Sequence, residues 1–125
     1  MTATPPTLRL TRETDDNELW LLLRLNGLLI GYLQVIDCGH ELWVMEIGVH
    51  PEHRGHGHGT RLLRALLDEN PSAQIAGSCG SFAPDHVWRR ARTGMPDTAL
   101  AAWYERHGFR PDRDDEDSRR MVRLP

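Results

Sequence analysis

Three consecutive segments largely determine the fold: the apolar run Leu42–His50, the loop Arg54-Gly55-His56-Gly57-His58-Gly59, and the segment Thr60–Glu69. Alternating apolar side chains predict that the first segment is a strand, which Pro51 ends because it has no backbone N–H to donate. Leucines at helical spacing predict an amphipathic helix in the third segment. Glycines at alternate positions leave the N–H groups before this helix uncovered, which favours a bound diphosphate. A glycine-rich turn without a ligand is the alternative for such a loop taken alone.

Arg54 stands at the mouth of this loop, where a guanidinium offers a forked set of donors to phosphate oxygens. The loop is not the dinucleotide-binding fingerprint, because its third glycine comes one position early. All 15 basic residues are arginine and none is lysine. The missing lysine excludes a P-loop, a Schiff-base enzyme and a Ser–Lys dyad.

The length of 125 residues fits a single domain, 1–125, and the 39% hydrophobic fraction is that of a globular protein. The net charge of −3 argues against a nucleic-acid partner. No apolar run approaches the roughly 18 residues of a membrane span. With two cysteines and no signal peptide in the opening residues, we expect a cytoplasmic protein without a membrane partner.

Around the central segments, the pattern predicts further strands and one more helix. Asn26-Gly27 between two apolar runs predicts a hairpin with a type I′ turn, buried on both faces. Asp97 can cap a helix through His107, and Gly108 is suited to end it. The remaining strands are expected at Thr7–Arg12, Glu18–Leu25, Leu28–Asp37, Gln74–Ser78 and a closing hairpin that includes Ser118–Leu124. This order predicts an α/β domain with a mixed sheet.

Several of these motifs together resemble the GNAT family of N-acetyltransferases. Arg54–Gly59, preceded by Ile47–Glu52, resembles the family's Arg-x-x-Gly-x-Gly motif for acetyl-CoA. Ile30-Gly31-Tyr32 resembles an early strand, Ala99–Phe109 a late helix, and Met121–Leu124 the last strand. The resemblance implies a mixed, mostly antiparallel sheet that is splayed between its fourth and fifth strands and flanked by helices.

The resemblance also implies roles for individual residues. The pantetheine arm would pair with the backbone of the central strand, and the loop would cradle the pyrophosphate. The implied acetyl-CoA-binding positions are Ile47, Gly48, Val49, Arg54, Gly55, His56, Gly57, His58, Gly59, Thr60, Asp97, Ala101 and Tyr104. Tyr104 would be the general acid for the departing thiolate, with a core aromatic residue as the alternative.

Acylation of an amine also needs a base, because an ammonium group has no lone pair. Glu41 is the first candidate, since it stands at the offset of the catalytic glutamate in one branch of the family. Glu46 is the second candidate. In a regular strand the two would face opposite sides of the sheet, so Glu46 needs a β-bulge to reach the site. The alternative for both is a solvated carboxylate at a strand end.

Three features depart from the family pattern. The residues from Arg12 to Glu18 leave no room for the two helices that usually form much of the acceptor pocket, so the site must be more open or supplied from elsewhere. Gly80–Pro96, which carries Trp88, is the candidate segment to replace them. Its Arg89, Arg90 and Arg92 either form an ordinary solvated helix face, which is the favoured interpretation, or hold an acidic acceptor or a CoA phosphate. Asp97 stands where the family commonly has asparagine.

The third departure is a group of histidines, His50, His53, His56 and His58, in and before the glycine loop. The preferred interpretation is an N-acetyltransferase that moves an acetyl group from acetyl-CoA to a primary amine by direct attack, without a metal. The acceptor is a small molecule or a peptide, and a homodimer is expected. A non-catalytic acyl-CoA-binding domain and a histidine-rich metal-binding module are the alternatives.

Overall fold

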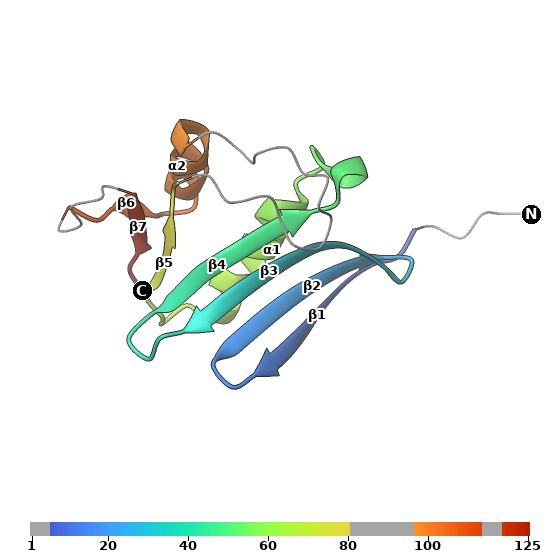
Figure 1. Cartoon of the computed structure of the whole chain (residues 1–125), viewed down its shortest axis with the longest axis horizontal. Coiled ribbons are helices and arrows are strands. Elements are labelled where there is room, and N and C mark those ends of the chain that lie inside the picture. The colour runs from blue at the N-terminus through green and yellow to red at the C-terminus, as the bar shows by residue number, and fades with distance from the viewer. Residues whose placement is uncertain (1–5, 81–96, 114–118) are drawn as a thin grey trace, which may run out of the picture.

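The computed structural model describes residues 6–80, 97–113 and 119–125 of the chain. They form one mixed seven-stranded sheet with the strand order β1-β2-β3-β4-β5-β7-β6 (Figure 1). The elements in chain order are β1 (Leu8–Asp15), β2 (Glu18–Leu25), β3 (Leu28–Asp37), β4 (Leu42–Val49), the 3₁₀ turn η1 (Pro51–His53), α1 (His58–Glu69), β5 (Ile75–Ser78), α2 (Asp97–Arg106), β6 (Arg110–Pro111) and β7 (Arg120–Arg123). The predicted α/β class and the element order are confirmed.

The first four strands form an antiparallel meander joined by short turns. Asn26 has a φ of 51° and Gly27 one of 83°, so both central residues of the β2–β3 turn are left-handed, as a type I′ turn requires. Asp16, with a φ of 52°, belongs to an equally short turn between β1 and β2. β1 therefore runs to Asp15, beyond the predicted end at Arg12, and the predicted absence of helices between these two strands is confirmed.

β4 and β5 lie side by side only at their first residues. Leu42 pairs with Ile75 and Trp43 with Ala76 in parallel register, after which the two strands separate. β5 instead pairs along its whole length with antiparallel β7. This parting is visible in Figure 1 and confirms the splayed sheet that the sequence predicts.

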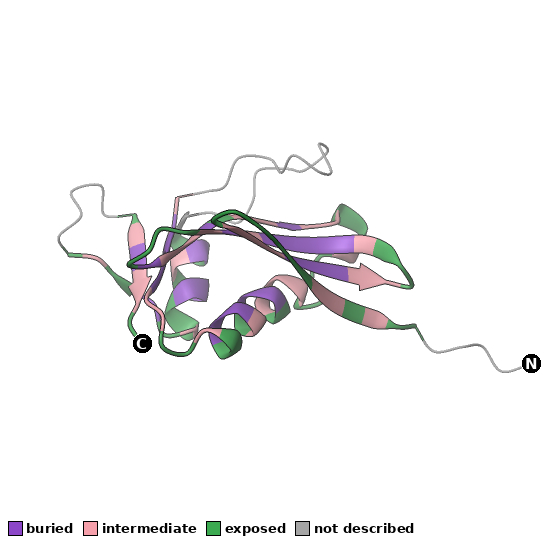
Figure 2. Cartoon of the chain, turned by 90° about the horizontal axis from the view of Figure 1, so that it is seen from below, coloured by how far each residue is buried: buried purple, intermediate pink, exposed green. Residues whose placement is uncertain are grey.

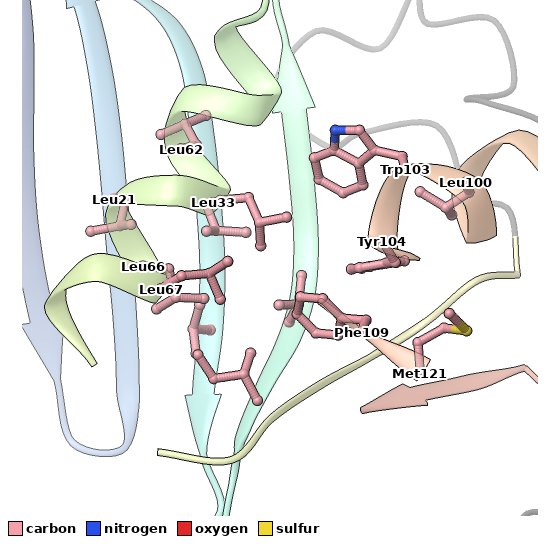
Figure 3. Packing of buried hydrophobic residues seen from close by; sticks show 14 of the residues in the cluster. Leu21, Leu33, Leu62, Leu66, Leu67, Leu100, Trp103, Tyr104, Phe109 and Met121 are labelled. Atoms are coloured by element: carbon pink, nitrogen blue, oxygen red, sulfur yellow. The ribbon is translucent and has the colours of Figure 1, made fainter. Parts of the chain in front are cut away.

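The main core lies between one face of the sheet and the two helices. Figure 2 shows both helices on the same side of the sheet. The predicted leucine stripe of α1 is fully buried, and it packs on residues such as Leu21 and Leu33 of the β2–β3 hairpin (Figure 3). The helices are also joined directly, since Trp103 Nε1 donates a 2.9 Å hydrogen bond to Thr60 Oγ1. Burial of this stripe fixes α1 on the sheet.

The opposite face of the sheet, which we call the helix-free face, carries neither of the two described helices. Strand alternation places Leu22 and Tyr32 on it, and both are buried. The centre of the hairpin is therefore buried on both faces, as its continuous apolar runs predict.

A buried ion pair holds together the end of the sheet where β4 and β5 still touch. Glu41 is 7% exposed and accepts hydrogen bonds from Arg120 of β7 and from Gln74 Nε2, the latter at 2.8 Å. The guanidinium of Arg120 also lies 5.9 Å from the centre of the Trp43 ring. Hydrogen bonds from Arg120 hold the pKa of Glu41 below its usual range against the opposing effect of burial. Glu41 thus links β4 to β7 across β5.

We expect Glu41→Gln to lower the free energy of unfolding at pH 7 by about 1–3 kcal/mol, because it replaces a buried carboxylate that is paired with the half-buried guanidinium of Arg120. A carboxylate whose pKa is lowered by folding stabilises the protein above its unfolded pKa and loses this effect as pH falls through the folded pKa. The difference between the two proteins should therefore shrink below about pH 4.5. Urea unfolding at pH 7 and pH 3 measures it, with exposed Glu105→Gln as the control. An unchanged difference at both pH values would contradict the ion-pair interpretation.

Candidate functional site

β4 contains a one-residue bulge in its middle. Gln34 of β3 pairs with Glu46 and the next residue, Val35, pairs with Val44, so Met45 is the extra residue. Met45 points into solvent and is 53% exposed. The bulge changes which face the following side chains take. Glu46 therefore shares the helix-free face with its pairing partner Gln34. A β-bulge before Glu46 is the condition that the sequence analysis set for this residue to reach the site.

Gly48 is required by the packing of an aromatic ring. A Cβ at this position would lie 2.4 Å from Cε1 of Tyr32, which pairs with Gly48 across β3 and β4. Only glycine lets the Tyr32 ring lie this close to the backbone of β4. Gly48 is therefore buried beneath this ring, while its neighbours Ile47 and Val49 are half-buried.

The segment after β4 begins with the 3₁₀ turn η1 and continues through the two left-handed glycines of the glycine loop. His50 Nδ1 accepts a 3.1 Å hydrogen bond from the N–H of Glu52 and so caps η1, a turn that the sequence analysis did not predict. Gly55 and Gly57 have φ values of 82° and 77°, which β-carbon-bearing residues rarely adopt. Neither glycine has other atoms within 4 Å of the place where a Cβ would stand. The loop is therefore open on its outer side.

α1 begins at His58, two residues earlier than the sequence predicts. Its N-cap residue is Gly57, and no side chain caps the helix. The first N–H groups of the helix, which include those of Gly59 and Thr60, are thus available to a ligand, and the helix dipole favours an anion there. Arg54 folds back over the end of β4, where its Nε donates a 3.0 Å hydrogen bond to the carbonyl of Val49. The predicted anion-binding residues are therefore brought together.

The four histidines form a chain of neighbouring rings along this loop. Ring centres are 5.5 Å apart for His50 and His53, 6.5 Å for His53 and His58, and 6.0 Å for His56 and His58. Burial lowers the pKa of His58 below its usual range, and the nearby charges of His56, His53 and Arg61 lower it further. No group of three His, Cys, Asp or Glu side chains in the described ranges is arranged to hold a metal ion. The geometry therefore gives the metal-module alternative no support.

Tyr104 of α2 lies at the open side of the β4–β5 parting. Its side chain is fully buried, and its hydroxyl oxygen would lie 2.6 Å from a Cβ placed on Gly77 of β5. Within the described part of the chain, this hydroxyl has no hydrogen-bond partner. Burial raises the pKa of the phenol well above its usual range, and the neighbouring Cys79 raises it further. Tyr104 is therefore a neutral phenol that can donate a proton into the parting.

Two other predicted positions also belong to α2. Asp97 is the first residue of the helix rather than the N-cap residue that the sequence predicts, and Ala101 is half-buried and packs against the core. The segment proposed to replace the acceptor helices, which carries Trp88, Arg89, Arg90 and Arg92, lies outside the described residues.

The two candidate bases occupy different surroundings. Glu41 is held by Arg120 and Gln74 at the closed end of the sheet, and its lowered pKa opposes proton uptake. Glu46 is half-buried, lies beyond the bulge and is two residues from Gly48. The geometry thus favours Glu46 over Glu41, the reverse of the order expected from the sequence.

Two contacts of the site region were not predicted in the sequence analysis. Tyr32 was noted only as part of the family-like strand Ile30-Gly31-Tyr32, and the packing of its ring over Gly48 was not foreseen. Arg120, the partner of Glu41, is 79 residues away along the chain, and no local pattern could have paired them.

Comparison with known proteins identifies the family. The model of the acetyltransferase (GNAT) domain matches residues 16–111. The mycothiol acetyltransferase of Streptomyces scabiei (strain 87.22) is 49% identical over 51 residues, and that of Streptomyces griseus is 43% identical over 61 residues. These matches cover 40% and 48% of this chain but only 17% and 20% of the relatives, so the chain spans about a fifth of their length.

Solved structures show the same fold. A GNAT family acetyltransferase from Elizabethkingia anophelis with acetyl-CoA bound has a TM-score of 0.63 at 12% identity, covering 92% of this chain and 94% of that one. The PaiA N-acetyltransferase of Thermoplasma acidophilum in complex with coenzyme A has a TM-score of 0.61 at 13% identity, covering 87% and 62%. With the family model matching most of its length, the chain belongs to the GNAT acetyltransferase family. None of its described helices is both long enough and apolar enough to span a membrane.

The contact between Gly77 and Tyr104 gives a stability prediction. Gly77→Ala should lower the free energy of unfolding by about 2 kcal/mol, because the new methyl group overlaps the phenol oxygen. The loss should be clearly smaller in a Tyr104→Phe background, where the overlapping oxygen is absent. Urea unfolding of the wild type, the two single variants and the double variant measures this coupling. Equal losses in both backgrounds would show that the hydroxyl does not lie over Gly77.

Proposed function

We propose that this chain is an N-acetyltransferase that moves an acetyl group from acetyl-CoA to a primary amine by direct attack in a ternary complex. The observation that carries the proposal is the uncapped N-terminus of α1 beside the β4–β5 parting, with the neutral phenol of Tyr104 facing that parting. Membership of the GNAT family supports it, as do the fold neighbours solved with coenzyme A or acetyl-CoA.

The residues present fit acetyl-CoA at its diphosphate and along its pantetheine arm. The open glycines Gly55 and Gly57 and the first N–H groups of α1 would hold the diphosphate, with Arg54 beside them. Ile47, Gly48 and Val49 would offer backbone groups to the pantetheine arm, because β5 has left this edge of β4. Acetyl-CoA supplies the activated acyl group, and the protein supplies position and proton transfer.

Proton transfer is assigned to two side chains. Glu46, on the helix-free face, takes the proton from the amine so that its lone pair can attack. Tyr104 donates its phenolic proton to the sulfur that leaves, which is consistent with a pKa raised by burial because the phenol is still protonated at neutral pH. Backbone N–H groups near Val49 would stabilise the oxyanion.

Tyr104→Phe tests the proposed function. It should reduce turnover roughly a hundredfold, measured by thiol release, while the affinity for acetyl-CoA in calorimetric titration changes little. Glu105→Gln is the control, since it changes an exposed residue of the same helix and should leave turnover unchanged. Unchanged turnover in Tyr104→Phe would contradict the acid role. Tight acetyl-CoA binding without turnover on a panel of amines would instead support the non-catalytic alternative.

Glu46→Gln tests the assignment of the base. We expect it to lower kcat more than tenfold with little effect on acetyl-CoA binding, because the amine then keeps its proton. Glu41→Gln, assayed at a temperature where both variants are folded, should change kcat less than twofold. The opposite result would restore Glu41 as the base.

Three expectations, about domain organisation, cellular location and oligomeric state, are still predictions. A single domain over 1–125 is supported by one hydrophobic cluster that joins the sheet to both helices. The cytoplasm is supported by Cys38 and Cys79, neither of which forms a disulfide. Light scattering of the purified chain would test the homodimer.

A further inference from the structure

A hollow of about 380 Å³ lies on the helix-free face, at the edge of the sheet formed by β1 and β2. Its lining residues are Thr7, Arg9, Thr11, Arg24, Asn26 and Gly27. These side chains are polar or cationic, and none of them is acidic. The hollow is separate from the glycine loop and from the parting of β4 and β5.

Two arginines face each other across this hollow. Arg9 of β1 pairs directly with Arg24 of β2, and like charges in directly opposed positions destabilise a sheet. Within the described residues, neither guanidinium forms an ion pair with a carboxylate. The next residues on the same face are Thr7 and Thr11 along β1 and Leu22 along β2. An anion bound between the guanidiniums would remove this repulsion.

Hydrogen bonds hold the rim of the hollow in place. Arg24 Nη1 donates to Thr11 Oγ1 at 3.1 Å, which orients the guanidinium. The N–H of Thr7 donates to Asn26 Oδ1 at 2.9 Å, and the N–H of Asn26 donates to the carbonyl of Thr7 at the same distance. The tip of the β2–β3 hairpin is thereby tied to the start of β1, and the hollow is preformed.

We propose that this hollow binds the carboxylate of the amine acceptor, an inference that rests on the proposed acetyltransferase function. Arg24 and Arg9 supply the forked donors that a carboxylate accepts, and the threonine hydroxyls add neutral donors. The hollow shares the helix-free face with Glu46, whereas α1, whose N-terminus would hold the cofactor, packs on the other face. An acceptor on this face therefore reaches the base without crossing the cofactor.

The sheet register gives the size of this acceptor. Arg24 pairs with Leu29 of β3, and Glu46 pairs with Gln34 of the same strand, five positions further along. Strand rise and strand spacing then separate the Cα atoms of Arg24 and Glu46 by about 20 Å. Because both side chains extend toward the acceptor, it must span roughly half of that distance, or about three extended residues. A peptide of about three residues fits, whereas a free amino acid is too short.

Triglycine and triglycinamide test the proposal, because both carry the same amine and only triglycine carries a carboxylate. We expect the wild type to acetylate triglycine with roughly tenfold higher kcat/KM than triglycinamide or glycine, and Arg24→Gln to abolish the preference over the amide. The control is Arg113→Gln, which changes an exposed arginine between β6 and β7 and should keep the preference. Equal rates for triglycine and triglycinamide in the wild type would overturn the proposal.

A binding measurement without acetyl-CoA separates this proposal from the proposed function. Triglycine, but not triglycinamide, should shift the amide NMR signals of Thr11 and Asn26 in the wild type and not in Arg24→Gln. Such shifts in a chain that shows no acetyl transfer would support the carboxylate site while the proposed function fails. If Arg24→Gln weakens binding of coenzyme A but not of coenzyme A lacking its 3′-phosphate, the hollow holds the cofactor, and the acceptor assignment is wrong.

Discussion

The parting of β4 from β5 after two residue pairs is the constraint on which the site depends. Backbone N–H and C=O groups need partners when they are buried, and the edge of β4 beyond Trp43 has none on β5. The ion pair between Glu41 and Arg120 holds the closed end of the parting. At the open end, Gly77 lets the ring of Tyr104 lie directly on β5. A strand pair fixed at one end and open at the other can bind an extended ligand without local unfolding.

The two faces of the sheet carry different features of the molecule. One face carries the core with α1 and α2, and the buried leucines of α1 fix the position of its uncapped N-terminus. The other face carries Glu46 and the arginine-lined hollow. The hydrophobic core includes no residue of the two-residue turn between β1 and β2. The two helices that the family usually has between these strands can therefore be absent without loss of the fold.

Local sequence patterns predicted most elements, since their signals act over a few residues. The Asn26-Gly27 turn needs two left-handed residues, the leucine stripe needs a helical period, and Gly108 ends a helix with a φ of 89°. The early start of α1 was missed, because His58 looks like loop sequence until Gly57 becomes the cap. The turn η1 was missed as well, since its cap is an imidazole nitrogen rather than a common capping oxygen.

The sequence by itself determined the strand, glycine loop and helix that define the anion site, because periodicity and glycine placement act within short segments. Only the tertiary structure shows how the surroundings of the two glutamates differ. The bulge at Met45 is a one-residue change of register that depends on pairing with β3, and it turns Glu46 to the helix-free face. The partner that engages Glu41 comes from 79 residues away. Cross-strand register likewise set Arg9 opposite Arg24, a relation that no short segment contains.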